Sequence, residues 1–275
     1  MAELSSLSVT GTLNVGYCCC ITSGYIWYNC SVNKLQYSYI GSSWSAGGAL
    51  STARQGLAGA GTQNAGLAFG GISPFRSCTE EYDGASWSAG GALITAIDRL
   101  AGAGTQNAGL AFGGTSNTAT ESCTEEYNGS SWSAGGALIT ARFVLAGTGE
   151  QNSGLAFGGS VFGAASCTEE YNGSSWSSGG ALSTARYNLA GAGTQNSGIA
   201  FGGSIPPGTS TNITEGYNGI SWSSCNNLII ARRCLAGAGT QNEALAFGGE
   251  NLSLIRVSCT EEFNSGASSI QVGSL

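Results

Sequence analysis

The stretch CTEEYNGSSWSAGGAL at residues 123–138 decides the fold, because copies of it recur through most of the chain. Its tryptophan belongs to a series spaced by 43, 45, 44 and 46 residues: Trp44, Trp87, Trp132, Trp176 and Trp222. A tyrosine stands five residues before each tryptophan, a Gly-Gly pair precedes most of these tyrosines, and a stretch such as LAGAGTQN comes earlier still. Similarity at a constant period indicates a repeat protein, in which each repeat is one structural unit.

Each repeat holds four short segments divided by Gly, Asn and Asp. In one copy they are residues 57–62, 66–71 and 78–82, followed by the segment around Trp87. None is long enough for an ordinary helix, and Asp83-Gly84 is a hairpin signal between the last two. Four short antiparallel strands repeating at about 45 residues predict the blade of a β-propeller. The small residues of the first segment suit the innermost strand, where blades crowd around the axis.

We expect a single all-β domain over residues 1–275, a six-bladed kelch-like β-propeller with four antiparallel strands per blade. Residues 12–50 are interpreted as a diverged first blade, with 15–22 and 24–29 as its first two strands and 39–44 covering the others. Residues 51–275 then supply five regular blades. Residues 1–11 contain a worn copy of the fourth-strand phrase, at 5–11, that would pair with the last blade and join the ring. Residues 268–273 compete for this place, and the sequence leaves the choice open.

The composition excludes several classes of function. The chain has 46 Gly, no His, nine basic and 16 acidic residues. Without His there is no imidazole base and no His-ligated metal, and we expect neither a cofactor nor a metal site. The net charge of −7 and the single lysine argue against nucleic acid and anionic membranes as partners. The first residues show neither a signal peptide nor a membrane span.

The Gly-Gly pair, the tyrosine, the tryptophan and the arginine of Thr-Ala-Arg together resemble the kelch-repeat family over residues 12–270. A WD-type propeller is disfavoured, because the chain has no Trp-Asp dipeptide and no His. The wording LAGAGTQN…AFGG…TEEYNGSSW is similar to kelch-type proteins carried by bacteriophages of aquatic bacteria, which are mostly thought to be virion or tail components. This resemblance implies a structural protein of the capsid, tail or fibre, located in the virion, with the cytoplasm as the alternative.

Variation between repeats is confined to two places. The loop after the Gly-Gly pair has 6, 8, 7, 9 and 9 residues in successive repeats, and the first four lengths follow the tryptophan spacings. The two residues after Thr-Ala-Arg also vary. Both segments leave a four-stranded blade on the same face, so we interpret that face as the recognition face. Neutral drift of tolerant loops is the other interpretation.

The variable segments carry apolar side chains beside scattered arginines, which suits a protein partner. A sugar platform would show several exposed Trp or Tyr side chains, and outside the repeat phrase this face offers only Tyr187. We therefore expect protein–protein interaction with other virion proteins, with a host-surface glycan as the alternative partner; self-association is left open. The candidate partner-binding residues are Phe75, Arg76, Asn117, Phe143, Phe162, Tyr187, Pro206, Pro207, Leu252, Leu254, Ile255 and Arg256.

Paired glutamates at 80–81, 125–126, 169–170 and 261–262 could suggest a glycosidase. Neighbours on a strand point to opposite faces, however, and the pairs recur with the repeat. We predict an architectural role, with one glutamate of each pair near an arginine of the series Arg54, Arg142, Arg186 and Arg232. Ile97 interrupts this series, and whether Arg99 replaces the missing arginine is open.

Cysteines recur at positions 78, 123, 167 and 259, and Ile213 takes the same place in one repeat, which indicates a buried small hydrophobe. The run Cys18-Cys19-Cys20, with Cys30, lacks the spacing of a zinc site, and we expect reduced thiols. Together with Lys34 it forms the basis of a rival hypothesis, a hydrolase or lyase using the first blade. The preferred interpretation is a non-enzymatic structural and interaction protein; a glycan-binding adhesin and an intracellular adaptor are further alternatives.

Overall fold

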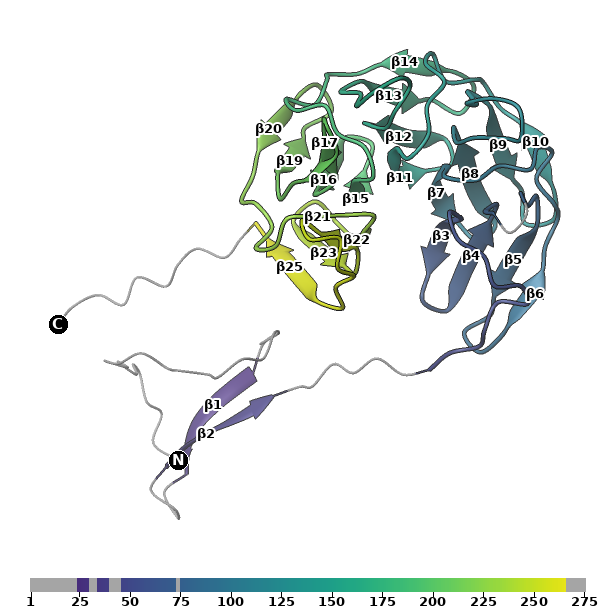
Figure 1. Ribbon diagram of the computed structural model, residues 1–275. Helices are drawn as coiled ribbons and strands as arrows, with labels where there is room; N and C mark the ends of the chain where they lie inside the picture. The colour runs from purple at the N-terminus through teal and green to yellow at the C-terminus, as the bar shows by residue number, and fades with distance from the viewer. Residues whose placement is uncertain (1–23, 30–33, 40–45, 73–74, 266–275) are drawn as a thin grey trace.

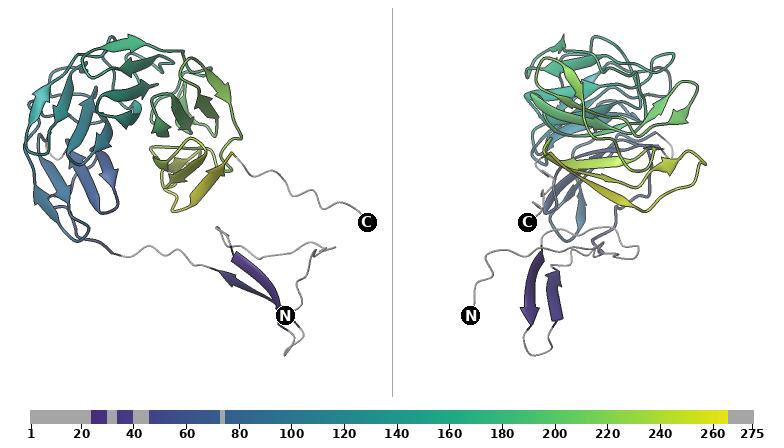
Figure 2. Two further views of the ribbon diagram at one scale, coloured as in Figure 1. Left: turned by 180° about the vertical axis from the view of Figure 1, so that it is seen from behind. Right: turned by 90° about the vertical axis from the view of Figure 1, so that its left-hand side faces the viewer.

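The computed structural model describes residues 24–29, 34–39, 46–72 and 75–265, and in them the chain forms strands, turns and loops without a helix (Figure 1). None of these residues belongs to a helix long and apolar enough to span a membrane. The strands form five small antiparallel sheets arranged as the blades of a β-propeller. Figure 2 shows the same arc of blades from behind and from the side.

Blades 1 to 4 each have four strands in the order of the chain, with the first strand innermost. Blade 1 comprises β3 (Ala58–Thr62), β4 (Ala65–Phe69), β5 (Thr79–Tyr82) and β6 (Trp87–Ala89). Blade 2 comprises β7 (Ala101–Thr105), β8 (Ala108–Phe112), β9 (Thr124–Tyr127) and β10 (Trp132–Ala134). Blade 3 comprises β11 (Ala146–Glu150), β12 (Ser153–Phe157), β13 (Thr168–Tyr171) and β14 (Trp176–Ser178). Blade 4 comprises β15 (Ala190–Thr194), β16 (Ser197–Phe201), β19 (Thr214–Tyr217) and β20 (Trp222–Ser224).

Blade 5 has three strands within the described residues: β22 (Ala236–Gly239), β23 (Glu243–Phe247) and β25 (Thr260–Asn264). Two-stranded ladders lie above blades 4 and 5. They are formed by β17 (Ser204–Ile205) with β18 (Thr209–Ser210), and by β21 (Arg232–Arg233) with β24 (Glu250–Asn251). The arc is open between blade 5 and blade 1 (Figure 1).

The prediction of six blades is wrong: the described residues form five blades, and the described part of residues 12–50 adds none. Their described strands, β1 (Gly24–Asn29) and β2 (Lys34–Tyr39), pair only with each other and stand apart from the blades (Figure 1). The strand at 24–29 was expected, but its partner is 34–39 and lacks the Thr-Glu-Glu sequence through which the blades contact one another. The predicted strand 15–22 and both candidate ring-joining segments, 5–11 and 268–273, lie outside the described residues.

Glycine in the innermost strands lets neighbouring blades approach one another. A Cβ atom on Gly102 would lie 2.6 Å from the ring of Phe69 in the preceding blade, and one on Gly237 would lie 2.6 Å from Phe201. The first strands therefore lie side by side around the axis, as the sequence predicted. The phenylalanine that ends the second strand is buried in blades 1 to 4 and partly buried in blade 5.

Three side chains of each repeat reach back to the preceding blade. The tryptophan Nε1–H donates to a threonine hydroxyl at 2.8–2.9 Å, in the pairs Trp132–Thr79, Trp176–Thr124 and Trp222–Thr168. The tyrosine hydroxyl donates to the second glutamate of the preceding pair, in Tyr127–Glu81, Tyr171–Glu126 and Tyr217–Glu170. The glutamine amide donates to two backbone carbonyls, as Gln151 does to Gly109 and Tyr127 at 3.0 and 2.6 Å.

In blade 2, Ile97 stands where the other blades have an arginine. In blades 1, 3, 4 and 5 the first glutamate of the third strand binds this arginine, which confirms the predicted proximity of glutamate and arginine. The pairs are Arg54–Glu80, Arg142–Glu169, Arg186–Glu215 and Arg232–Glu261, at 2.5, 2.5, 2.8 and 3.1 Å. All four arginine side chains are fully buried. The two glutamates of a pair therefore act in different contacts, one inside the blade and one between blades.

The recurring cysteines are half-buried, not fully buried as expected, and three of the four lie beside these arginines. Arg54, Arg142 and Arg232 place Nη1 at 3.1, 2.9 and 3.1 Å from the cysteine Sγ of their blades. Where Ile213 replaces cysteine, Arg186 Nη1 donates to the carbonyls of Gly202 and Ile213. The six described cysteines are free thiols: Cys78, Cys123, Cys167, Cys225, Cys234 and Cys259.

Candidate functional site

The two variable segments of each repeat are hydrogen-bonded to each other above the blade. Backbone bridges join the residue after Thr-Ala-Arg to the residue after Gly-Gly, in the pairs Gln55–Ile72, Asp98–Thr115, Phe143–Ser160 and Tyr187–Ser204. In blade 5 the strands β21 and β24 make the equivalent pairing. Linker and loop therefore form one continuous surface, which we call the loop face.

The base of the loop face is a chain of backbone hydrogen bonds that crosses from blade to blade. The N–H groups of Arg99, Val144, Asn188 and Cys234 each donate to the carbonyl of the equivalent residue one blade earlier, beginning at Gly56, at 2.7–3.0 Å. These four residues have φ between 48° and 54°, and Gly56 has φ 68°. Left-handed backbone is strained for residues with a side chain, and most of all for a β-branched one. The base is thus built from the backbone, which leaves the side chains free to vary.

A hollow of about 650 Å³ lies on this base. Five of the predicted residues line it: Phe143, Phe162, Tyr187, Pro206 and Pro207. Phe162 is fully exposed at the tip of its loop, whereas Phe143 and Tyr187 are half-buried. The structure thus brings together apolar side chains from the variable segments of blades 3 and 4.

The other predicted residues lie on the same loops but outside the hollow. Leu252, Leu254 and Ile255 form an apolar tip after β24, with 60%, 64% and 60% of their surfaces exposed. Arg256 and Asn117 are exposed, while Phe75 and Arg76 are half-buried beside blade 1.

Sequence reasoning missed residues that shape this surface. Arg99, Val144, Asn188 and Cys234 line the hollow, and their place as the second residue of each variable pair was the available signal. Arg233 was missed as well. Its side chain binds Glu250 at 2.7 Å and donates to the Gly208 carbonyl at 3.0 Å, which ties the loops of blades 4 and 5 together. No sequence pattern marks this contact.

The charges near the hollow are engaged in pairs. Arg99 Nε lies 3.4 Å from Asp98, so it does not replace the arginine missing at Ile97. The hydrogen bonds that Arg233 donates to Glu250 raise the pKa of Arg233, and withdrawal from water raises the pKa of the Cys234 thiol. A thiol with a raised pKa stays protonated near neutral pH and is a poor nucleophile. The described residues include no cluster of three His, Cys, Asp or Glu side chains able to hold a metal ion.

Of the residues behind the rival enzymatic hypothesis, the structure describes the position of Lys34 alone. Lys34 begins β2, in the hairpin apart from the blades. Cys18, Cys19, Cys20 and Cys30 lie outside the described residues.

In comparisons with known proteins, no family model matches the sequence and no curated protein matches it significantly. The kelch and bacteriophage resemblances therefore rest on the wording of the repeat, whereas the β-propeller architecture rests on the structure.

Proposed function

We propose that this protein is a non-enzymatic kelch-type propeller that binds another protein through its loop face, as a component of a bacteriophage particle. The observation that carries the binding role is the hollow, where apolar side chains from blades 3 and 4 converge on a base of backbone hydrogen bonds. The base is made of backbone hydrogen bonds. It can therefore hold the variable side chains in place whatever their identity.

A protein partner fits this surface better than a charged polymer. Three aromatic and two proline side chains line the hollow, and an apolar tip at Leu252, Leu254 and Ile255 stands on the neighbouring loop. Aromatic residues and arginine are enriched where proteins bind one another, and a few such residues carry most of the binding energy. Phe162 and Tyr187 are the anchors we expect to matter most.

The test is incorporation into particles assembled in cells that supply the protein as the wild type or as a variant. We expect mass spectrometry to find the wild type in purified particles. The double variant Phe162→Ala with Tyr187→Ala should be depleted at least ~10-fold, because two interface anchors are removed. Ile220→Ala is the matched control, since Ile220 is 78% exposed but lies in a turn at the outer strands of blade 4. Absence of the wild type from particles would refute the virion role.

A glycan ligand is the second candidate, favoured by the three aromatic side chains that share the hollow. A glycan array with the wild type and the same double variant separates the two functions. Selective sugar binding that the double variant loses and Ile220→Ala keeps would assign the hollow to a glycan. If no sugar binds while incorporation still depends on Phe162 and Tyr187, the protein partner stands.

A further inference from the structure

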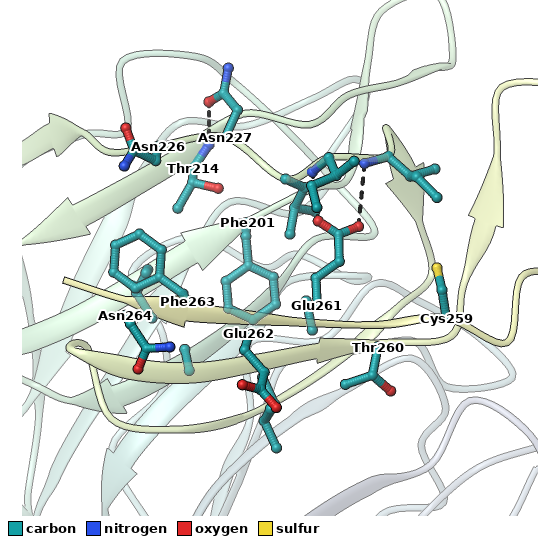
Figure 3. Close-up of a pocket in the computed structure, with 17 residues that line it drawn as sticks. Phe201, Thr214, Asn226, Asn227, Cys259, Thr260, Glu261, Glu262, Phe263 and Asn264 are labelled. Atoms are coloured by element: carbon teal, nitrogen blue, oxygen red, sulfur yellow. Dashed lines mark hydrogen bonds between the residues drawn. The ribbon is translucent and has the colours of Figure 1, made fainter. Parts of the chain in front are cut away.

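A second cavity, of about 480 Å³, lies between blades 4 and 5 at the outer edge of β25 (Figure 3). Phe201 and Thr214 line it from blade 4, and Ala246 and Phe263 line it from blade 5. In blades 1 to 4 a fourth strand pairs with the third. The cavity therefore lies beside the strand edge at which blade 5 lacks this partner within the described residues.

The same place at the other junctions holds a tryptophan. Trp132, Trp176 and Trp222 lie on the phenylalanine of the preceding blade, with ring centroids 4.9–5.0 Å apart, and each donates Nε1–H to a threonine. At the cavity, the equivalent threonine is Thr214, which is 2% exposed and whose Oγ1 has no hydrogen-bond partner. An unpaired buried hydroxyl is unfavourable. An apolar ring with a hydrogen-bond donor, such as an indole, would fill the cavity and satisfy this hydroxyl.

We propose that Trp44 of the same chain fills this cavity, with residues 44–46 as the fourth strand of blade 5. Trp44 lies in the phrase SSWSAGGAL, as the tryptophans of the regular fourth strands do. The glycines that follow it are already in place on blade 1. A Cβ atom on Gly47 would lie 2.7 Å from Tyr82 Oη, the same distance that separates Gly90 from Tyr127 Oη. Trp44 is thus three residues from a segment held at the open end of the arc.

The two ends of the arc offer the halves of one more junction. Blade 1 presents Tyr82, Trp87 and Gln63. These are the counterparts of the tyrosine, tryptophan and glutamine that donate hydrogen bonds at the three junctions between blades 1 and 4. Blade 5 presents the matching acceptors, namely Glu262, Thr260 and the carbonyls of the Ala244–Phe263 pair. Tyr82 and Trp87 are half-buried, whereas Tyr127 and Trp132 are buried. Docking of blade 1 on blade 5 would satisfy these groups and bring residues 44–46 beside β25.

At the junction of blades 4 and 5, the glutamate acceptor and the tyrosine donor are both replaced. Gly216 of blade 4 replaces the glutamate acceptor, and Phe263 of blade 5 lacks the tyrosine hydroxyl that would have used it. At the ends of the arc, both Glu262 and Tyr82 are retained. The backbone chain of the loop face agrees: it runs from Gly56 to Cys234, the residues that would meet in a ring of five.

The test is a double-mutant cycle on the full chain, with chemical denaturation as the readout. We expect Trp44→Phe and Thr214→Val each to lower the denaturation midpoint, and the double variant to lower it no further, because both remove the same hydrogen bond. Trp176→Phe with Thr124→Val is the matched cycle at an interior junction. Additive effects, or a midpoint raised by Thr214→Val alone, would overturn the proposal, because an unoccupied cavity gains from losing an unpaired hydroxyl.

Three further measurements separate the competing occupants. Trp27→Ala should leave the midpoint unchanged while Trp44→Ala lowers it as Trp132→Ala does; the reverse order would assign the cavity to Trp27. Ile270→Ala should also have no effect, and a loss as large as that of Trp44→Ala would assign it to the C-terminal residues. Light scattering should show a monomer. A dimer that Trp44→Ala dissociates would place the strand of a second copy in the cavity and overturn occupation by the same chain.

Discussion

Glu125 is a buried carboxylate whose blade has no arginine to bind it. Its oxygens accept the N–H groups of Ile94 and Thr95 at 2.8 and 3.0 Å, and Ile97 stands where the other blades have the buried arginine. Desolvation raises the pKa of Glu125 above its ordinary value. The charged form is therefore less favourable in the folded protein than in the unfolded chain.

Ile97→Arg should restore the pair and increase the free energy of unfolding by about 1.5 kcal/mol, the size of a hydrogen bond to a charged group. Ile97→Met is the control, since it conserves the volume without adding a charge. Urea denaturation at neutral pH measures both variants. Equal stability of the arginine and methionine variants would show that the carboxylate gains nothing from a partner.

The same comparison has a defined pH dependence. In the wild type, the unfavourable charge on Glu125 exerts its full effect above the folded-state pKa and is relieved as the pH falls through that pKa towards 4.5. In Ile97→Arg, the ion pair stabilises the charged form and is lost on acidification. The advantage of the variant should thus shrink between pH ~7 and pH ~5 in denaturation experiments. An advantage that grew on acidification would contradict this account.

Val144 is the β-branched residue among the four with left-handed backbone at the base of the loop face, and its φ is 48°. Val144→Gly should stabilise the protein by about 1 kcal/mol, because glycine adopts left-handed backbone without a Cβ clash. Asn188→Gly is the matched control with φ 54°, and its gain should be smaller because asparagine tolerates this region. Thermal denaturation tests the order, which a larger gain at Asn188 would reverse.

At the residue scale, partners were predictable where the repeat shows them. The alternation of strand side chains separated the two roles of the paired glutamates, and the arginine series located their ion pairs. The isolation of Glu125 was not predictable, because Arg99 stood two residues away as a plausible substitute. The ion-pair partner of Arg99 is Asp98. The backbone turn at positive φ sets this contact, and the sequence does not reveal that turn.

The third strand is the element that joins blades, since its second glutamate and its tyrosine face opposite sides of the sheet. At the junction of blades 4 and 5, three substitutions compensate one another. Gly216 removes the acceptor and Phe263 removes the donor. Cys225 replaces a glycine at which a Cβ atom would lie 2.7 Å from a tyrosine hydroxyl, as Gly179 shows.

Phe263→Tyr should therefore destabilise the protein by about 1–3 kcal/mol, because its hydroxyl meets the Cys225 side chain and has no acceptor. Adding Cys225→Gly and Gly216→Glu should recover that stability, since the three changes recreate an interior junction. The melting temperatures of the single and triple variants provide the comparison. A single variant as stable as the wild type would show that this junction is open enough to accept the hydroxyl.

The strands themselves were predictable from short segments punctuated by turn residues, and the four-stranded blade follows from them. The backbone pairings on the loop face were not predictable. Pairs such as Tyr187–Ser204 join the linker to the loop after Gly-Gly, and these two segments share no sequence pattern. The hollow was predictable as a face but not as a cavity, since its members come from separate loops whose tips converge only in the folded arc.

For the whole molecule, the repeat established the architecture and misled on the number of blades. Residues 12–50 contain strand-like segments at nearly the right spacing, yet they lack the Thr-Glu-Glu sequence whose side chains make the contacts within and between blades. Spacing alone cannot distinguish a diverged blade from a separate hairpin. The contacts between blades can, because they require specific donors and acceptors.

The stability of the whole molecule should not depend on disulfides, because the six described cysteines are free thiols. The melting temperature should be the same with and without a reducing agent. A lower value under reduction would reveal a disulfide among Cys18, Cys19, Cys20 and Cys30.

The equivalence of the junctions has a consequence for the gene. Because each repeat encodes the donors for the blade before it and the acceptors for the blade after it, unequal recombination within the repeated DNA can add or delete a blade without creating an unmatched interface. Recombination of this kind also moves whole loops between blades, so the recognition surface can be reshuffled faster than point mutation would allow. A single substitution at a junction, in contrast, leaves a donor or an acceptor unmatched. Gly216 and Phe263 are an example in which the change in one blade is accompanied by a matching change in the neighbouring blade.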